Sequence, residues 1–186
     1  MKIPHAAYLL VLMWLVHAAQ LLFTVNFNSF GILPRELSGL IGILFAPWLH
    51  GGWWHLIGNS FPFLILGALI QLKNTEIFWE STLIITIVAG FGTWLFGSAT
   101  YHIGASGLAL GYWSFILADA FFSRSIKAIL LASITLVMYG SFIFIVLDFR
   151  PHISWSGHLS GILAGILVAK LYFNSLNKTE CQDHMQ

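Results

Sequence analysis

Charged residues and cysteines are scarce in this chain. Only 8% of its 186 residues are charged, whereas soluble domains usually carry about 25%. A surface that faces water cannot be built from so few charges, so a soluble domain is excluded. The one cysteine, Cys181, excludes an internal disulfide and a metal site made of several cysteines. The net charge of +1 gives no reason to expect a nucleic-acid partner.

Hydrophobic residues, in contrast, make up 58% of the chain, and the mean hydropathy is +0.85. A bilayer core needs about 20 apolar residues per helix, and six stretches meet this requirement. We therefore predict an all-α membrane protein with a bundle of six transmembrane helices in one domain, residues 1–176. A short polar cytoplasmic tail, residues 177–186, is expected to be frayed. The six predicted spans are residues 6–25, 53–72, 80–98, 105–122, 127–147 and 154–173.

Lysine and arginine residues are distributed unevenly between the two ends of these spans. Cytoplasmic loops of membrane proteins carry an excess of both residue types, which favours a cytoplasmic N-terminus. The even-numbered spans then begin at the outer face. Because the chain has no N-terminal targeting extension, a bacterial plasma membrane is the expected location. This orientation puts Lys2, Lys73, Arg124, Lys127, Lys170 and Lys178 inside, and Arg35 and Arg150 outside.

The segment between the first two spans, residues 26–52, is long for a membrane hairpin and rich in apolar residues. Such a segment is expected to lie half-buried at the membrane interface rather than in water. Trp53 and Trp54 follow it and suit the headgroup region. We therefore predict a membrane-embedded first loop.

Ser106 stands at the head of the fourth span, in the sequence Gly104-Ala105-Ser106-Gly107. A serine at a helix start lies among unpaired backbone N–H groups and at the positive end of the helix dipole. An oxyanion would be stabilised there, and the glycines allow a tight turn and a close helix contact. Alone, the motif fits a nucleophile and a small packing residue equally well.

His158 stands at the head of the sixth span, in apolar surroundings where a histidine is costly and usually has a partner or a function. Gly161 and Gly165 share its side of the helix, so this span can pack closely on a neighbour. Gly107 and Gly111 offer matching space on the fourth span. By itself, this pattern is more typical of a glycine-lined packing helix with one hydrogen-bonded histidine than of a catalytic site.

His55 and Asn59 lie four residues apart and share one face of the second span. A histidine ring nitrogen and an asparagine amide both donate hydrogen bonds, so both can point at an oxyanion beside the Ser106 N–H. Two other interpretations stay open: a polar pair that joins helices, and an i,i+4 metal site. A metal needs a third ligand, and the only carboxylate that can reach this depth is Asp148. No metal is therefore predicted.

The other histidines and aspartates are expected to lie outside the reaction centre. Asp119 follows Ser106 by about 20 Å of helix, so it cannot orient His158, whereas Asp148 is a candidate neighbour. The simplest arrangement is a Ser–His dyad without an acid. His5, His17 and His184 are expected at the inner end, in the first span and in the tail, and His50, His102 and His152 in solvated outer loops, with His50 at the border of the site.

Three motifs, in this order and at one depth, resemble the rhomboid family of intramembrane serine proteases. The similarity covers roughly residues 5–175, and the combination is far more specific than any one motif. The motifs are His50-Gly51-Gly52-Trp53-Trp54-His55-Leu56-Ile57-Gly58-Asn59, Gly104-Ala105-Ser106-Gly107, and Gly157-His158-Leu159-Ser160-Gly161 with Gly165.

The resemblance implies that Ser106 is the nucleophile and that His158 is the general base and acid. His55, Asn59 and the Ser106 N–H would form the oxyanion hole. The implied reaction is hydrolysis of transmembrane substrate proteins near the outer membrane boundary, without a cofactor. Substrates would enter beside the embedded first loop or a mobile fifth span, so substrate helices and membrane lipid are the expected partners.

Two details depart from the family pattern. Leu110 occupies the position of an aromatic residue that often supports the histidine ring, and Tyr112 comes two residues later. Arg35 lacks the tryptophan that often precedes an arginine in the first loop. These departures concern the surroundings of the dyad and not the dyad itself.

Two other classes of function compete with a protease. An inactive relative that binds or escorts membrane helices usually lacks the serine or the histidine, and both are present here. A small transporter or channel usually carries charged residues inside its spans, and here Asp119 is the exception. The sequence does not indicate an oligomeric state.

Overall fold

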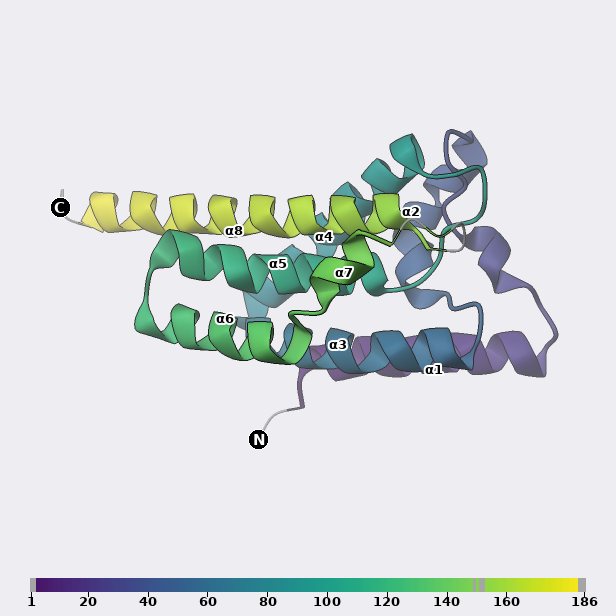
Figure 1. The fold of residues 1–186 in the computed structure, drawn as a ribbon, viewed down its shortest axis with the longest axis horizontal. Helices are drawn as coiled ribbons and strands as arrows, with labels where there is room; N and C mark the ends of the chain where they lie inside the picture. Colours follow the sequence, from purple (N-terminus) through teal and green to yellow (C-terminus); the bar gives the residue numbers. More distant parts are fainter. Residues whose placement is uncertain (1–2, 149, 151–152, 184–186) are drawn as a thin grey trace.

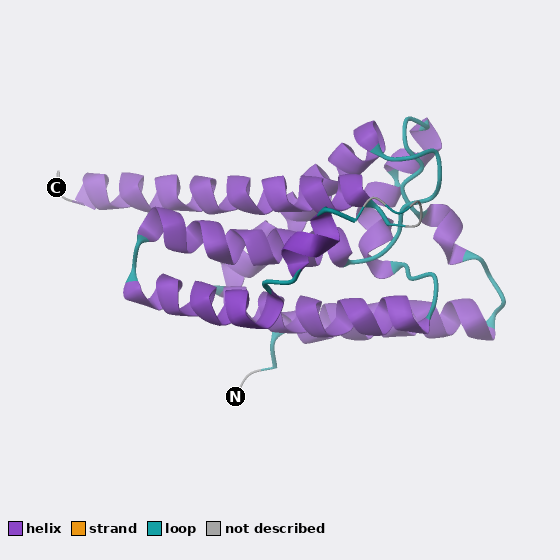
Figure 2. Cartoon of the chain, viewed as in Figure 1, coloured by secondary structure: helices purple, strands orange, loops and turns teal. Residues whose placement is uncertain are grey.

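The computed structural model describes residues 3–148, 150 and 153–183, with residues 176–183 described by their backbone alone. The described residues form helices joined by short loops, with one isolated antiparallel bridge between Ile32 and His102 (Figures 1 and 2). The predicted all-α class is therefore confirmed. The α-helices are α1 His5–Leu22, α2 Gly42–Phe45, α3 Trp53–Gln71, α4 Thr75–Phe96, α5 Ser106–Ser123, α6 Ile126–Tyr139, α7 Phe142–Val146 and α8 Trp155–Asp183, and the 3-10 helices are η1 Phe27–Phe30, η2 Leu37–Leu40 and η3 Ala46–Trp48.

Four helices of the described chain are long and apolar enough to cross a membrane: α1, α3, α4 and residues Trp155–Ser175 of α8. These correspond to the first, second, third and sixth predicted spans. Helix α5 has the position of the fourth span, but it carries polar side chains such as Ser114 and Asp119 along its length. The predicted number of six spans is therefore not confirmed.

The predicted fifth span, residues 127–147, is not one continuous helix. Helix α6 ends at Tyr139, and α7 begins only at Phe142. Gly140 and Ser141 lie at the break, and glycine and serine are frequent at sharp kinks. With 14 residues, α6 is about 21 Å long at 1.5 Å per residue, which is shorter than a bilayer core of about 30 Å.

Helix α8 is longer than predicted. The sixth span was expected to end at residue 173 and to be followed by a frayed tail, whereas the helical backbone continues to Asp183. Figure 1 shows its C-terminal turns extending past the other helices. Helix propagation from a packed segment explains this, because each added residue forms one more hydrogen bond without a new nucleation step.

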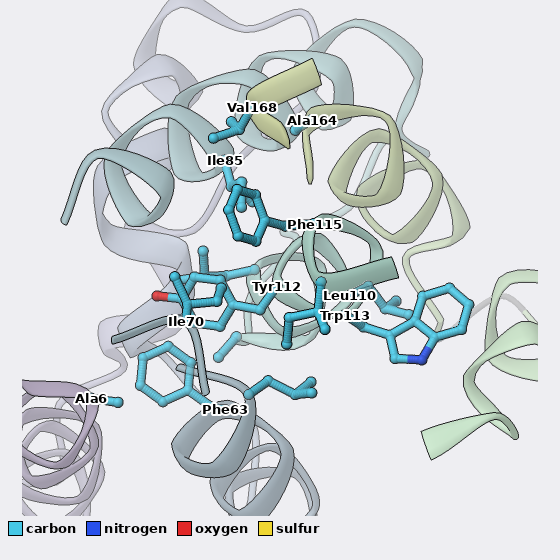
Figure 3. Packing of buried hydrophobic residues seen from close by; sticks show 14 of the residues in the cluster. Ala6, Phe63, Ile70, Ile85, Leu110, Tyr112, Trp113, Phe115, Ala164 and Val168 are labelled. Atoms are coloured by element: carbon cyan, nitrogen blue, oxygen red, sulfur yellow. The ribbon is translucent and has the colours of Figure 1, made fainter. Parts of the chain in front are cut away.

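Helix α5 lies in the middle of the bundle, between α8 and α6 (Figure 1), and it also packs on α3 and α4. Large apolar side chains on all its faces are buried, among them Leu110, Tyr112 and Phe115. Figure 3 shows the Tyr112 ring in this core, near Phe63 and Ile70 of α3. The helix that begins with Ser106 is thus held from every side, which fixes the position of its first residue.

Close contact between α5 and α8 depends on glycines, as the sequence predicted. A Cβ at Gly161 would lie 2.9 Å from the carbonyl carbon and 3.2 Å from the Cα of Gly107. A Cβ at Gly165 would lie 2.9 Å from the carbonyl carbon of Gly111. Real Cβ atoms are almost never found at such distances from backbone atoms, so only glycine allows the two helices to approach this closely.

The loop between α1 and α3 is a folded part of the bundle. Its short helices η2 and α2 pack on α4, where Gly90 makes space for Ile43, and η3 packs on α1 and α5. Ile32, Ala46 and Leu49 of this loop are buried. This packing agrees with the expectation that the loop avoids water. Insertion of the loop in the membrane remains a prediction.

A largely buried ion pair joins the turn between α3 and α4 to α5, at the end of the bundle opposite Ser106. Lys73 contacts the Asp119 carboxylate, and the Asp119 side chain is only 6% exposed. The Lys73 ammonium also lies 5.3 Å from the centre of the Tyr172 ring and 6.0 Å from that of Phe115. The predicted distance between Asp119 and His158 is consistent with this placement at the far end of α5.

Replacing Asp119 with alanine is expected to lower the free energy of unfolding by about 1–3 kcal/mol, because the Lys73 ammonium would lose its partner in a partly buried site. Denaturant titration in detergent micelles, followed by circular dichroism, would measure this loss. The matched control is Glu80→Ala on the exposed part of α4. Equal stability of the two variants would show that the ion pair contributes nothing to folding.

Candidate active site

A cavity of about 670 Å³ opens at the end of the bundle where α3, α5 and α8 begin. Ser106, His158, His55 and Asn59 all line it, so the structure brings together the residues that the sequence singled out. Ile145 of α7 contributes to its wall. The polar residues of this lining come from segments far apart in the sequence: His55, Asn59, Thr100, Tyr101, His102, Ser106, Ser154 and His158.

Ser106 and His158 are hydrogen-bonded to each other. The Ser106 Oγ lies 2.9 Å from the His158 Nε2. His158 is 5% exposed, and its Nδ1 has no hydrogen-bond partner within the described part of the chain. A serine hydroxyl can donate to an unprotonated Nε2, which requires the neutral ring to carry its proton on Nδ1. The two side chains therefore have the contact that a nucleophile and its base need.

The backbone at Ser106 places an N–H group at the N-terminus of α5, directly after a sharp turn at Gly104. Ser106 is the first residue of α5, so its N–H is among those without a partner inside the helix. Gly104, two residues earlier, has a φ of +109°, and its N–H donates to the Ala46 carbonyl at 2.8 Å. This positive φ turns the chain sharply into α5 and explains why a glycine precedes the serine.

His55 and Asn59 project from α3 toward the same loop. A methyl group placed on Gly104 would lie 2.5 Å from the His55 Nε2 and 3.3 Å from the Asn59 Nδ2. The Asn59 Nδ2 is buried and has no hydrogen-bond partner among the described residues. Two side-chain donors thus lie beside the turn that leads into Ser106, and one of them is without an acceptor.

His50 is buried, contrary to the prediction of a solvated loop residue. Its ring packs edge-on against His55 with centroids 5.0 Å apart, and its carbonyl accepts a hydrogen bond from the His17 Nδ1 at 3.2 Å. Burial, and next the nearby His55, lower the pKa of His50 to about 3, so the ring is neutral at physiological pH. The sequence carried no local sign of this burial, because it comes from contacts with His17 and His55 of other segments.

His102 is also buried, and its prediction as a solvated residue was wrong. Its ring is held by hydrogen bonds to Ser98 and Ser154, and its backbone pairs with Ile32. Burial lowers the pKa of His102. His152 and His184 lie outside the described residues.

The other polar residues considered from the sequence, Tyr112, Asp148 and His5, make hydrogen bonds to groups other than Ser106 and His158. The Tyr112 hydroxyl lies 2.6 Å from the Thr82 Oγ1, and its ring is in the core with the side chain of Leu110 (Figure 3), so its hydroxyl is committed to α4. Arg150 donates to both carboxylate oxygens of Asp148. His5 accepts from the Trp79 Nε1 at 2.9 Å.

No group of three or more His, Cys, Asp or Glu side chains is placed to hold a metal ion within residues 3–148, 150 and 153–175. A second, much smaller cavity of about 50 Å³ lies behind the dyad and is lined by Thr86, Thr93 and Ser154 together with both dyad residues. The side chains that line these two cavities therefore offer hydroxyls, imidazoles and an amide.

Comparison with known proteins places this chain in a family. A family model of the Rhomboid domain matches residues 37–175. An uncharacterized protein of Mycobacterium tuberculosis is 39% identical over 172 residues, which cover 86% of this chain and 70% of that protein. One of Mycobacterium leprae is 34% identical over 179 residues, covering 91% and 71%.

A more distant relative is the RHOMBOID-like protein 6, mitochondrial, of Arabidopsis thaliana, which is 28% identical over 127 residues, covering 66% of this chain and 40% of that protein. The family match spans η2, α2 and η3 of the first loop and the segments that carry Asn59, Ser106 and His158. This chain is an integral membrane protein that belongs to the rhomboid family.

Proposed function

We propose that this protein is an intramembrane serine endopeptidase that hydrolyses peptide bonds of transmembrane proteins with a Ser106–His158 dyad. The observation that carries the proposal is the 2.9 Å contact between the Ser106 Oγ and the His158 Nε2, at the wall of a 670 Å³ cavity. Rhomboid family membership supports the same reaction class.

The first step is attack of Ser106 on the scissile carbonyl. His158 takes the hydroxyl proton on its Nε2 as the new C–O bond forms, and an acyl-enzyme results after the tetrahedral intermediate collapses. During that collapse, His158 gives the same proton to the leaving amine as the C–N bond breaks. A water molecule that enters through the cavity hydrolyses the ester with His158 again as base.

Charge on the intermediate oxygen is stabilised by the Ser106 N–H at the start of α5, together with the His55 Nε2 and the Asn59 Nδ2. Support for this role comes from the unpartnered Asn59 amide and from the approach of both side chains to Gly104. Donors held in place before the reaction need no reorganisation as the charge develops, which is why they lower the barrier.

The dyad acts without a carboxylate. Asp119 is paired with Lys73 at the far end of α5, and Asp148 binds the Arg150 guanidinium. The His158 ring is instead held by its helix and by the hydroxyl of Ser106. Burial of the ring restricts its motion, so the base keeps its orientation through packing.

The membrane arrangement belongs to the proposal. Helix α5 and the α6–α7 segment cross the bilayer with α1, α3, α4 and α8, which makes six crossings. The N-terminus is cytoplasmic, as the lysine and arginine distribution indicates, and the cavity faces the outer side of a bacterial plasma membrane. Substrate helices are cut near that outer boundary, where water reaches the dyad.

The test is cleavage of a reporter transmembrane protein by the purified wild-type chain in liposomes. We expect one main cut, located by mass spectrometry of the fragments within the outer third of the reporter's span. Treatment with a fluorophosphonate should abolish the cut. Binding of the reporter without any cleavage would instead support a helix-binding relative and would overturn the protease assignment.

Replacing Asn59 with alanine is expected to reduce kcat by about 10²–10³-fold, because the intermediate would lose one donor. KM should change little, since the donor acts on charge that is absent from the bound substrate. Steady-state cleavage of a fluorogenic reporter peptide measures both constants. The matched control is Ser60→Ala, the next residue of α3, whose hydroxyl donates to the Leu56 carbonyl instead; an equal loss in both variants would rule out the oxyanion role.

A further inference from the structure

The His102 ring connects two segments that are distant in the sequence. Its Nδ1 lies 2.6 Å from the Ser154 Oγ, and its Nε2 lies 3.0 Å from the Ser98 carbonyl oxygen. His102 itself is four residues before Ser106, and Ser154 is four residues before His158. His102 is 8% exposed, and it lines the large cavity together with Ser154.

The two contacts define which ring nitrogen carries the proton. A carbonyl oxygen only accepts, so the Nε2 must donate to Ser98. A neutral ring then has an unprotonated Nδ1, which accepts from the Ser154 hydroxyl. Burial lowers the pKa of His102, which keeps the ring neutral and this direction of donation fixed.

The backbone around this pair leads directly to both members of the dyad. The Ser154 carbonyl accepts the hydrogen bond from the His158 N–H at 3.0 Å, in the first turn of α8. On the other side, the His102 N–H donates to the Ile32 carbonyl at 2.8 Å, and the Ile32 N–H donates back at 3.0 Å. His102 therefore joins the first loop, the loop that carries Ser106 and the start of the helix that carries His158.

We propose that His102 is a positioning residue, which keeps Ser106 within hydrogen-bonding distance of His158 through its contact with Ser154. The inference rests on the proposed protease function. The α5–α8 glycine contacts hold these helices together further along, and the His102–Ser154 hydrogen bond fixes their first turns relative to each other. Displacing reacting groups by about 1 Å can cost about 10²-fold in rate.

The experiment compares two amide replacements of the ring. In His102→Asn, the side-chain oxygen can take the place of the Nδ1 and accept from Ser154. In His102→Gln, the longer side-chain amide can take the place of the Nε2 and donate to the Ser98 carbonyl, but it leaves the Ser154 hydroxyl without its acceptor. For both variants and for Ser154→Ala, kcat and KM with the reporter are measured, together with the rate of fluorophosphonate reaction at Ser106 and the thermal unfolding midpoint.

We expect His102→Gln and Ser154→Ala to lower kcat and the fluorophosphonate rate by about 10- to 100-fold, with KM changed less than about twofold. His102→Asn should keep most of the wild-type rate, and combining His102→Gln with Ser154→Ala should add no further loss.

Equal rates for the Asn and Gln variants, or losses that follow the unfolding midpoint, would overturn the positioning role. An inactive wild-type protein would instead refute the proposed function, and the inference with it.

Discussion

Replacing Ser106 with alanine should reduce cleavage by about 10⁴-fold or more, and replacing His158 with alanine should have a similar effect. Without the Oγ no acyl-enzyme can form, and without the imidazole the hydroxyl keeps its proton. The 2.9 Å contact makes the two groups one unit. The double variant should therefore be no slower than either single variant. Single-turnover cleavage of the reporter in liposomes measures all three.

A suitable control for these variants is Ser114→Ala. This serine is also on α5, but its Oγ donates to the carbonyls of Gly111 and Ile162 within the packed interface. Its replacement should leave cleavage within about threefold of wild type, because the hydroxyl is remote from the cavity. Residual cleavage by Ser106→Ala at the level of this control would show that another group is the nucleophile.

A single methyl group at Gly161 should disable the protein as well. The Gly161→Ala side chain would lie 2.9 Å from the Gly107 carbonyl carbon, which is backbone and cannot rotate away. We expect the free energy of unfolding to fall by about 1–3 kcal/mol from overpacking. Cleavage should fall by about 10²-fold or more, because α8 must shift and take His158 with it.

The matched control is Gly58→Ala in α3, where an added Cβ has no heavy atom within 4 Å. Alanine favours a helix over glycine by up to about 1 kcal/mol, so this variant should be as stable as wild type or more so. Thermal unfolding in detergent, with cleavage assayed on the same preparations, compares the two. If Gly161→Ala unfolds and cleaves like Gly58→Ala, the glycine contact does not position the dyad.

The sequence predicted the contact between Ser106 and His158 because three motifs occur in one order and at one depth. Each motif alone was ambiguous, since serine and glycine are also common where membrane helices pack and a histidine there can simply be hydrogen-bonded. The glycines at 161 and 165 also carried a periodic signal that identified the packed face of α8. The predicted start of every long span lies within a few residues of a helix start in the structure, apart from α4, which begins at Thr75 instead of residue 80.

The surroundings of the dyad could not be predicted in the same way. His50 and His102 lie in connecting segments, and only tertiary contacts bury them. The sequence shows neither that Ile32 pairs with His102 nor that Ser154 reaches its ring, because these partners are 70 and 52 residues away from it. The break at Gly140 and the length of α8 likewise depend on packing and cooperativity more than on local propensity.

The proposed protease depends on activation of Ser106 by His158 inside a cavity that water can enter. The most direct test of this activation is peptide mass spectrometry of the protein after timed exposure to a fluorophosphonate. We predict a single adduct on the peptide that contains Ser106 in the wild-type protein, and a rate of adduct formation at least about 10²-fold lower in His158→Ala. Adduct formation on Ser106 at the same rate without His158, or on a different residue, would show that His158 does not activate Ser106.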